Sequence, residues 1–425
     1  MTNSQKAQNR RDFLRSFSFY AGSSLLLSAV PWLGPTLKGQ EKDNLRPIKL
    51  GVIGTGSRGK YLLKHLLTLP DAEIPAVCDN YAPNLNKAIE ITKGKARGYK
   101  DYQRMIEKEQ LDGVIIATPL HWHARMTIFA LQAGIHVFCE KSMARNVQDC
   151  KAMVETRKQT GNILQIGHQR LFDIKYLKGI ERIRKNELGK ITQIKAYWHR
   201  NNDWRRHVPS PELERKINWR LYKEYSAGLM TELASHQIQV ANWVLKEVPE
   251  YIMGSGSINF WKDGREVADN VNLVYKYPSG THLIYDSLIS NRFYGLEEQV
   301  MGSKGTMEFE KGKRYQDNPP APPAILQLIN DIEHGIFDEI PIGGASWIPE
   351  TAREYKGEYI TDKHPIPNSS TVQLIAFMNS IRENKPIPGM LKEAYYASVA
   401  ALLGHQAIEE KKIIKWPGDL MLNEF

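Results

Sequence analysis

The chain has 425 residues, of which 42% are hydrophobic and 24% are charged. These values exclude wholesale disorder, and the length predicts two domains. The formal net charge is +10, but five basic residues lie in the first 40 positions and the rest are dispersed, so no nucleic-acid partner is expected. Cys78, Cys139 and Cys150 lack CxxC spacing, which predicts buried thiols rather than a disulfide framework or a zinc site.

Residues 1–45 are predicted to be an export signal and linker. Arg10 and Arg11 are adjacent, and an uncharged, mildly apolar stretch follows from residue 17 to residue 30. This order resembles a twin-arginine (Tat) signal, which carries folded proteins to the periplasm or cell envelope. A basic tail is the plainer alternative. Because no clean small-x-small cleavage site is evident, an uncleaved signal that anchors the protein to the membrane is a further alternative.

Residues 46–166 alternate short apolar runs with helical patterns. Gly134 and Gly161 follow two of the helical patterns in the manner of carboxy-terminal caps. Continuous apolar strands separated by helices predict an α/β domain with a doubly wound parallel sheet of the Rossmann type. The expected strands lie within 48–56, 73–79, 113–119, 135–140 and 163–167, and the expected helices within 61–69, 85–93, 124–134 and 146–161.

Residues 167–425 have a different texture, with longer β-branched or aromatic runs separated by Gly, Asn and Pro. We predict an α+β domain with a largely antiparallel open sheet, including a hairpin that turns at residues 278–280. Residues 311–365 are rich in Pro, Gly and charge and are expected to be irregular. The expected strands lie within 191–201, 251–261, 270–280, 281–290 and 305–312, and the late helices within 371–384 and 394–412.

A glycine-rich turn follows the first strand of this chain. Gly54, Gly56 and Gly59 have G-x-G-x-x-G spacing between a strand and a helix, where glycines permit a tight turn and close approach of a pyrophosphate. Asp79 ends the second strand, 20 residues beyond Gly59, where a carboxylate can bind both ribose hydroxyls. No arginine follows it directly, so NAD is favoured over NADP. The intervening loop residues Thr55, Ser57 and Arg58 complete the expected phosphate site.

The next strands end in polar residues that should face the same crevice, because open α/β sheets bind ligands at the carboxyl ends of their strands. A nicotinamide-side wall is predicted from Thr118, Pro119, His121, Trp122 and His123, although surface packing explains His121 equally well. The H-x-H pair lacks a third convincing ligand, so no metal is expected. Glu140 and Lys141 end the following strand.

The ordered set of G-x-G-x-x-G, Asp79, the sequence ATP at 117–119 and the sequence EK at 140–141 resembles the Gfo/Idh/MocA oxidoreductases. The resemblance continues through 167–173, 228–245 and 302–310. It implies that Lys141 acts as an acid/base or polarising group beside the sugar hydroxyl and the nicotinamide. The family usually has proline after this lysine, whereas this chain has Ser142.

The resemblance also places an acid and a histidine four positions apart on one helix, here Glu232 and His236. His236 is expected to be the general base or proton relay, with Glu232 orienting it or binding substrate. Gln169 is expected near the nicotinamide ribose. The segments after it supply aromatic and basic side chains that suit a carbohydrate cleft. The predicted substrate contacts are Arg170, Tyr197, His199, Trp219, Arg220 and Tyr222, with Trp198, Arg200, Asn201, Trp204 and Arg205 nearby.

These features predict an exported NAD enzyme that oxidises a secondary hydroxyl of a sugar or glycoside. Reduced cofactor is not readily recycled outside the cytoplasm, so a tightly held NAD that is restored in each turnover is expected. The alternatives are an NAD-dependent glycosidase that works by transient oxidation and elimination, a plain 3-keto-glycoside-forming dehydrogenase, and a catalytically idle NAD- or sugar-binding protein. In the family the open sheet often forms dimers or tetramers, which implies a homo-oligomer.

Overall fold

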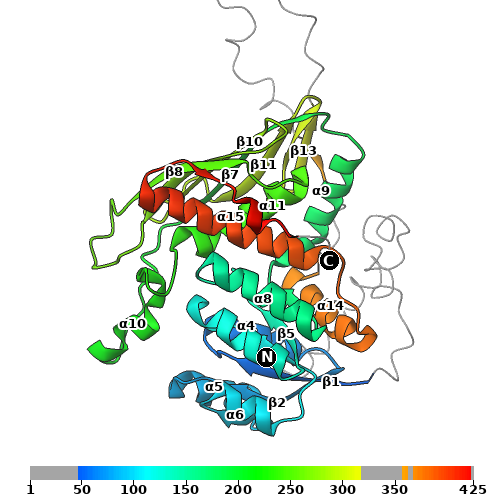
Figure 1. The fold of residues 1–425 in the computed structure, drawn as a ribbon, viewed down its shortest axis with the longest axis vertical. Helices are drawn as coiled ribbons and strands as arrows, with labels where there is room; N and C mark the ends of the chain where they lie inside the picture. Colours follow the sequence, from blue (N-terminus) through cyan, green and yellow to red (C-terminus); the bar gives the residue numbers. More distant parts are fainter. Residues whose placement is uncertain (1–45, 317–356, 362–366, 423–425) are drawn as a thin grey trace, which may run out of the picture.

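The structure is a computed structural model that describes residues 46–316, 357–361 and 367–422 (Figure 1). The predicted export signal at 1–45 lies outside these ranges. Among the helices that are described, none is long and apolar enough to cross a membrane. The fold consists of a parallel sheet with helices on both faces and a second, larger sheet that is covered on one face.

The first sheet has six strands that all run parallel, which confirms the predicted Rossmann-type domain. Five of its strands fall in the predicted runs. The sixth, β3, was missed because its residues are exposed or half-buried and form no apolar run. In spatial order the strands are β3 (Arg97–Tyr99), β2 (Ala72–Cys78), β1 (Ile48–Ile53), β4 (Gly113–Ile116), β5 (His136–Cys139) and β6 (Leu164–Ile166).

Three helices pack on each face of this sheet. One core cluster joins the sheet to α4 (Ser57–Leu66), α5 (Ala82–Ile91) and α14 (Ser369–Glu383), whose Phe377 ring meets Phe138 at 5.9 Å. Thus α14 belongs to the nucleotide-binding core, although it lies in the range assigned to the second domain from sequence. The opposite face is covered by α6 (Tyr102–Lys108), α7 (His123–Gln132) and α8 (Val147–Thr160).

The second sheet has nine strands, all paired antiparallel except β7 with β10, in agreement with the predicted largely antiparallel sheet. The predicted hairpin joins β9 and β10, where Tyr277 N donates to Thr281 O at 2.9 Å. The region predicted to be irregular, residues 311–365, contributes β13 and β14. Its residues 317–356 and 362–365 are outside the ranges that the structure describes. The strand order is β14 (Glu358–Tyr359), β13 (Lys313–Gln316), β12 (Gly305–Glu308), β11 (Leu296–Gly302), β7 (Ile191–His199), β10 (His282–Leu288), β9 (Asn270–Lys276), β8 (Tyr251–Ser257) and β15 (Ile414–Lys415).

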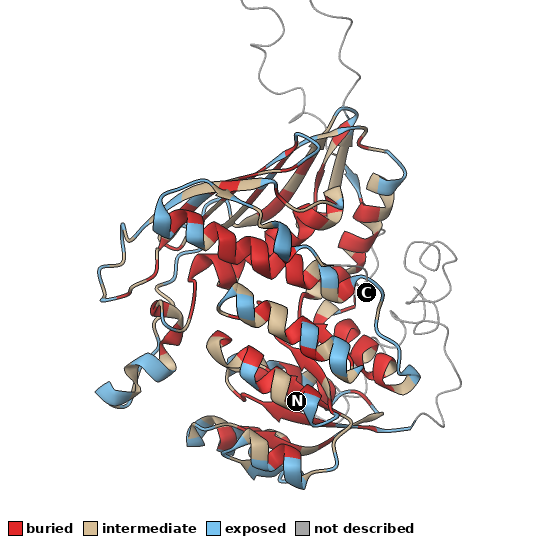
Figure 2. Ribbon diagram, in the orientation of Figure 1, coloured by how far each residue is buried: buried red, intermediate tan, exposed pale blue. Residues whose placement is uncertain are grey.

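The helices α9 (Ile174–Arg184), α11 (Ser235–Leu245) and α15 (Met390–Glu410) cover one face of this sheet, and the central part of α15 is buried (Figure 2). Gly404 permits this packing, because a Cβ there would lie 2.2 Å from the hydroxyl of Tyr275. Since α15 also contacts α8 and β6, it joins the two domains. The cavity described below lies between these joined domains.

All three cysteines are buried, as predicted. Burial raises the pKa of the Cys78 and Cys150 thiols to about 12, so both are protonated and unreactive at neutral pH. Within the described ranges, no group of three or more His, Cys, Asp or Glu residues is placed to hold a metal ion.

Candidate active site

The glycine turn forms a close contact with the first turn of α4. Gly54 has φ +82°, and a Cβ added at Gly59 would lie 1.9 Å from Gly54 O, so both positions require glycine. A Cβ at Gly56 would clash with nothing, because the nearest atom, Asn84 Nδ2, lies 4.0 Å away. This is the arrangement in which a pyrophosphate can approach the backbone at Gly56.

Asp79 lies beside this turn at the end of β2. Its Oδ2 accepts a hydrogen bond from Thr55 N at 2.8 Å, and its Oδ1 accepts one from Tyr81 N at 2.8 Å. Gly56 is the N-cap of α4 and supplies no side-chain cap, which leaves the first N–H groups of the helix for an anion. The turn, the helix end and the carboxylate together fit the pyrophosphate and ribose of NAD.

Substituting Gly56 by alanine should weaken NAD binding about tenfold or more, because the methyl group occupies the space where the pyrophosphate approaches. The fold of the NAD-free protein should be unaffected, since the atom nearest to the added Cβ, Asn84 Nδ2, is 4.0 Å away. Titration of NAD into stripped protein, with thermal unfolding of the same sample, measures both. Gly418→Ala is the matched control, as its Cβ also meets open space far along the chain; equal NAD affinity in both variants would contradict the assignment.

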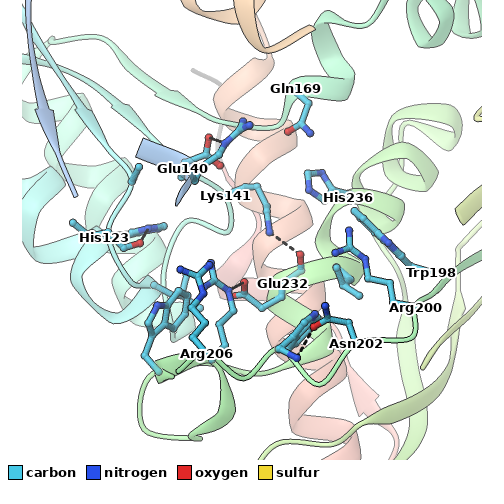
Figure 3. A pocket seen from close by; sticks show the side chains of 18 of the residues that line it. His123, Glu140, Lys141, Gln169, Trp198, Arg200, Asn202, Arg206, Glu232 and His236 are labelled. Carbon is cyan, nitrogen blue, oxygen red and sulfur yellow. Dashed lines mark hydrogen bonds and ion pairs between the residues drawn. The ribbon is translucent and has the colours of Figure 1, made fainter. Parts of the chain in front are cut away.

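A cavity of about 560 Å³ opens between the two domains (Figure 3). The structure brings ten of the predicted site residues to its wall: Arg58, Thr118, His123, Glu140, Lys141, Gln169, Trp219, Arg220, Glu232 and His236. Four further lining residues were expected near the substrate: Trp198, Arg200, Trp204 and Arg205. The remaining five were not predicted as site residues: Ala117, Leu120, Asn202, Arg206 and Leu233.

Glu140, which follows β5, forms an ion pair with Arg58 in the first turn of α4. The Nε of Arg58 lies 2.8 Å from Oε1 of Glu140, which is 6% exposed. Arg58 Nη1 also donates to Ser370 Oγ at 3.4 Å, on the first turn of α14. Arg58 therefore connects the nucleotide turn to the strand end that carries Lys141.

Lys141 reaches across the cavity to the second domain. Its Nζ donates to the backbone carbonyl oxygens of Glu232 at 2.7 Å and Thr231 at 3.3 Å. Burial lowers the pKa of Lys141, while the charges of Glu232 and Glu140 oppose that effect. The Lys141–Ser142 peptide bond is cis, and Ser142 Oγ donates to Thr231 O at 3.1 Å. The serine at the family's proline position thus contacts the same carbonyl as the lysine.

Glu232 lies in a π-helical turn, Met230–Ala234, that precedes α11. Its Oε2 accepts from Arg220 Nε at 2.6 Å. Burial would raise the pKa of Glu232, but the charges of Arg220 and Lys141 outweigh it and hold the pKa below its usual range. The carboxylate is therefore ionised at neutral pH and pairs with Arg220. This corrects the expectation that Glu232 orients His236, because Arg220 holds the carboxylate.

His236 is 5% exposed and faces the cavity beside Trp198, with the ring centroids 5.7 Å apart. Burial, followed by the charge of Lys141, lowers its pKa well below the usual value. Within the described ranges Nδ1 has no hydrogen-bond partner, so a neutral His236 is available to exchange a proton. His168, which the sequence analysis did not select, lies behind it with a ring-centroid distance of 6.0 Å.

His123 connects the ends of two strands. Its Nδ1 lies 2.9 Å from Ser142 O and its Nε2 lies 3.0 Å from Thr118 O. His121 and Trp122 do not line the cavity. The ring of His121 instead contacts Tyr225 at 4.6 Å, and burial lowers its pKa to about 4. Pro119 precedes the short helical turn and does not line the cavity either. Of the five residues predicted to form the nicotinamide-side wall, only Thr118 and His123 line the cavity.

Four predicted substrate residues lie away from the cavity wall. Tyr197 and His199 alternate with the cavity-lining Trp198 on β7, so they project to the open face of the sheet, where His199 pairs with Asp286. The hydroxyl of Tyr222 instead donates to Glu214 at 2.7 Å. Arg170 is buried behind Trp198, with its guanidinium 5.7 Å from that ring. For these residues the expected position in the cleft is wrong.

Arg170 is part of a buried ion-pair network. Its Nη1 lies 2.8 Å from Oε1 of Glu298, and its Nη2 lies 3.2 Å from Oε1 of Glu310. Burial alone would lower the pKa of Arg170, but the charges of Glu298 and Glu310 are among the causes that outweigh burial and raise the pKa. The hydroxyl oxygen of Tyr176 lies 2.6 Å from Glu298 Oε2 and 2.7 Å from Glu310 Oε1, so its single proton is donated between these two carboxylates. Arg170 therefore has a structural role in this network.

Replacing Arg170 by methionine should lower the free energy of unfolding by about 3 kcal/mol, because it leaves the buried Glu298 without its cation. The midpoint of urea unfolding measures the effect. Arg97→Met removes an exposed arginine from its ion pair with the half-buried Glu109 and should change the midpoint much less. Equal midpoints for the two variants would show that the network does not stabilise the fold.

The fold and this cavity define a class. A Rossmann domain with a fitting dinucleotide turn, followed by a sheet domain that closes a polar cavity over it, is the architecture of an NAD-dependent oxidoreductase. Residues 48–168 match the family model described as "Oxidoreductase family, NAD-binding Rossmann fold", and residues 176–308 match the "GFO/IDH/MocA C-terminal domain". The chain belongs to the Gfo/Idh/MocA family.

Similar proteins include both dehydrogenases and a glycosyl hydrolase by name. The chain is 25% identical to myo-inositol 2-dehydrogenase of Thermotoga maritima, over 87% of this chain and 98% of that protein. It is 31% identical to a glycosyl hydrolase family 109 protein of Stenotrophomonas maltophilia, over 45% of this chain and only 43% of that protein. Scyllo-inositol dehydrogenase of Lactobacillus casei with bound NAD(H) and scyllo-inositol has the same fold, with TM-score 0.63, 19% identity and coverage of 87% and 99%.

Proposed function

We propose that this protein is an NAD-dependent oxidoreductase that acts on a secondary hydroxyl of a sugar or glycoside. The observation that carries the proposal is the position of Lys141 in the cavity wall. Its side chain is half-buried in the cavity wall, desolvation lowers its pKa, and it lies at the strand end beside the glycine turn. The inositol dehydrogenases among the similar proteins support a polyhydroxylated substrate.

The chain's own residues supply the proton chemistry. When bound, NAD supplies the hydride acceptor for the C–H bond that breaks as the C=O bond forms. The hydroxyl proton passes to neutral Lys141, whose Nζ is oriented by the carbonyl oxygens of Glu232 and Thr231. His236 is neutral and unpartnered at Nδ1 among the described residues, so it relays the proton onward. The ionised Glu232 fixes Arg220 at the cavity wall.

We further propose export by the twin-arginine-like segment at residues 1–45, to the periplasm or cell envelope. The adjacent Arg10 and Arg11 before an uncharged stretch support this. A protein exported in folded form retains the NAD it bound in the cytoplasm. Its overall reaction is then redox-neutral, because each turnover must restore the oxidised cofactor where no recycling partner is at hand.

A glycosidase reaction is the second candidate, and the similarity to glycosyl hydrolase family 109 proteins favours it. In this reaction, oxidation of a hydroxyl to a ketone acidifies the neighbouring C–H bond, and loss of that proton expels the aglycone. Water then adds to the double bond, and the hydride returns to the ketone. The proton acceptors needed are Lys141 and His236, so the same cavity serves either reaction.

A panel of aryl glycosides and free sugars, followed at 340 nm and at the aglycone's own absorbance, tests the proposal. Each sugar is supplied alone, so that an oxidoreductase has no second substrate to restore its cofactor. Lasting reduction of bound NAD then identifies the oxidoreductase, and aglycone release without lasting reduction identifies the redox-neutral glycosidase. If neither signal appears with NAD bound, the protein is a catalytically idle binder. Cell fractionation of tagged protein, with Arg10→Lys and Arg11→Lys combined as the comparison, tests export.

We also propose a homo-oligomer formed through the open face of the second sheet. Exposed apolar side chains support this: Ile284 lies on that face, and Phe293 and Tyr294 follow it in the β10–β11 connection, where they are 84% and 65% exposed. Exposed apolar groups of this size commonly mark an interface. Sedimentation velocity reports the oligomeric state directly.

A further inference from the structure

The cavity wall carries more positive than negative side chains. Its basic residues are Arg58, Lys141, Arg200, Arg205, Arg206 and Arg220, whereas its acidic residues are Glu140 and Glu232. Three of the arginines are neutralised: Arg58 by Glu140, Arg220 by Glu232, and Arg205 by Glu214 and Asp263 outside the wall. Among the described residues, no carboxylate pairs with Arg200 or Arg206. Uncompensated cations that line a cavity attract an anion.

The unpaired charge of Arg206 lies on the side of the cavity where NAD is expected to bind. Arg206 N donates to Asn218 Oδ1 at 2.7 Å and Asn218 Nδ2 donates to Arg206 O at 3.0 Å, so Arg206 is held against the segment that precedes Trp219. The segment that follows Arg206 also touches the end of β2, where Lys216 Nζ donates to Asn80 O at 3.1 Å. Arg206 therefore belongs to the segment that reaches the end of β2, beside Asp79 and the expected ribose of NAD. Figure 3 shows it well separated from Arg200.

Arg200 lies on the opposite, substrate-domain wall. Figure 3 shows it with Trp198 and His236 on one side of the cavity, facing Lys141. Its guanidinium carbon is 4.7 Å from the centroid of the Trp198 ring, which in turn lies 5.7 Å from the ring of His236. A charged group bound by Arg200 would therefore belong to the same molecule that presents its hydroxyl to Lys141 and His236.

The backbone holds Arg200 in a fixed position. Arg200 N donates to Leu288 O at 2.9 Å, and Asn202 N donates to Ile289 O at 3.0 Å, so the pairing of β7 with β10 continues beyond the strand end. Asn202 also lines the cavity, and its amide offers a further N–H donor beside the guanidinium. A guanidinium on a rigid element, stacked on an indole, is a preorganised anion site.

We propose that the substrate is an anionic sugar, and that Arg200 binds its acid group while Lys141 and His236 act on its hydroxyl. This inference rests on the proposed oxidoreductase function. The planar guanidinium can donate two parallel N–H bonds to a carboxylate or to a sulfate ester. The ligand is thus a uronic acid or a sulfated sugar, and the neutral sugars lack the group that this wall is built to bind.

Three matched methyl glycosides test the inference: a glucoside, the corresponding glucuronide, and the glucoside 6-sulfate. The full chain with bound NAD is used. Quenching of tryptophan fluorescence measures each dissociation constant, since Trp198 and Trp219 line the cavity, and absorbance at 340 nm measures reduction of NAD. We expect one of the two acidic sugars to bind about 10- to 100-fold more tightly than the glucoside, the range of a charge-assisted hydrogen bond. Whichever acid is preferred identifies the group.

Arg200→Gln should remove that preference, and Arg200→Lys, which retains charge but not the fork, should retain part of it. Arg104→Gln removes an exposed arginine from α6 and should preserve the preference in full. NAD content and circular dichroism verify that each variant is folded. Equal binding of acidic and neutral sugars by the unmodified chain, or an unchanged preference in Arg200→Gln, would overturn the inference while the oxidoreductase function stood. If, in addition, no sugar reduced NAD and no aryl glycoside of the panel described above released its aglycone, the proposed function itself would fail.

Discussion

Replacing Lys141 by methionine should lower the rate of hydride transfer to bound NAD by about a thousandfold, within the range that general acid–base catalysis contributes. Methionine has a similar length and no amine, so the hydroxyl proton loses its acceptor. NAD should remain bound, because the glycine turn, Asp79 and the Arg58–Glu140 pair are untouched. The substitution should therefore impair proton transfer and leave NAD binding intact.

Single-turnover absorbance at 340 nm, with the NAD content measured after denaturation, separates these two effects. Lys64→Met is the control, because Lys64 is exposed on α4 and has no place on the cavity wall. It should react at the rate of the unmodified chain. A Lys141→Met protein that kept a near-normal rate would move the role of base to His236.

The nucleotide site could be predicted from the sequence because its parts are local. Gly54, Gly56 and Gly59 lie within one turn, and the strand ends at Asp79 and Lys141 are brought to one edge by the rule that parallel strands bind ligands at their carboxyl ends. The structure adds the reason for two of the glycines, which is the contact between Gly59 and Gly54 O. These predictions required no knowledge of long-range pairing.

The substrate side was harder to predict, because the face of a strand depends on register. Tyr197 and His199 lie in a segment rich in aromatic residues, which predicts sugar contacts. Side chains alternate along β7, however, and the cavity is lined by Trp198 and, beyond the strand end, by Arg200 and Asn202. Arg170 was chosen for its charge, whereas its partners Glu298 and Glu310 are more than 100 positions away. No local pattern indicates which arginine a distant carboxylate will neutralise.

The electrostatics of Lys141 could not be read from the sequence either. Burial lowers its pKa, whereas the carboxylate of Glu232 raises it. Arg220 has the opposite effect, and it is itself held by Glu232. Burial is the largest of these effects, and the charges of the ion pair adjust the pH at which the lysine becomes neutral, the form that accepts a proton.

Glu232→Gln should consequently move the acid limb of the pH profile of kcat/KM to lower pH, by about one unit. The substitution removes a charge that raises the pKa of Lys141 and leaves Arg220, which lowers it, unpaired. A lower pKa means that the lysine is deprotonated at a lower pH, so kcat/KM begins to rise at a lower pH. The plateau should fall roughly tenfold to a hundredfold, since the loss of the ion pair loosens the cavity wall.

Rates measured from pH 5 to pH 10 for the unmodified chain, Glu232→Gln and the exposed-residue control Glu107→Gln test this shift. The control should reproduce the original limb, because Glu107 lies on α6 away from the cavity. The direction also distinguishes the two candidate bases. Burial and then the charges of Lys141 and Arg170 are the largest influences on the pKa of His236. A limb that stayed in place in Glu232→Gln would therefore assign the titrating base to His236 and leave Lys141 as a polarising group.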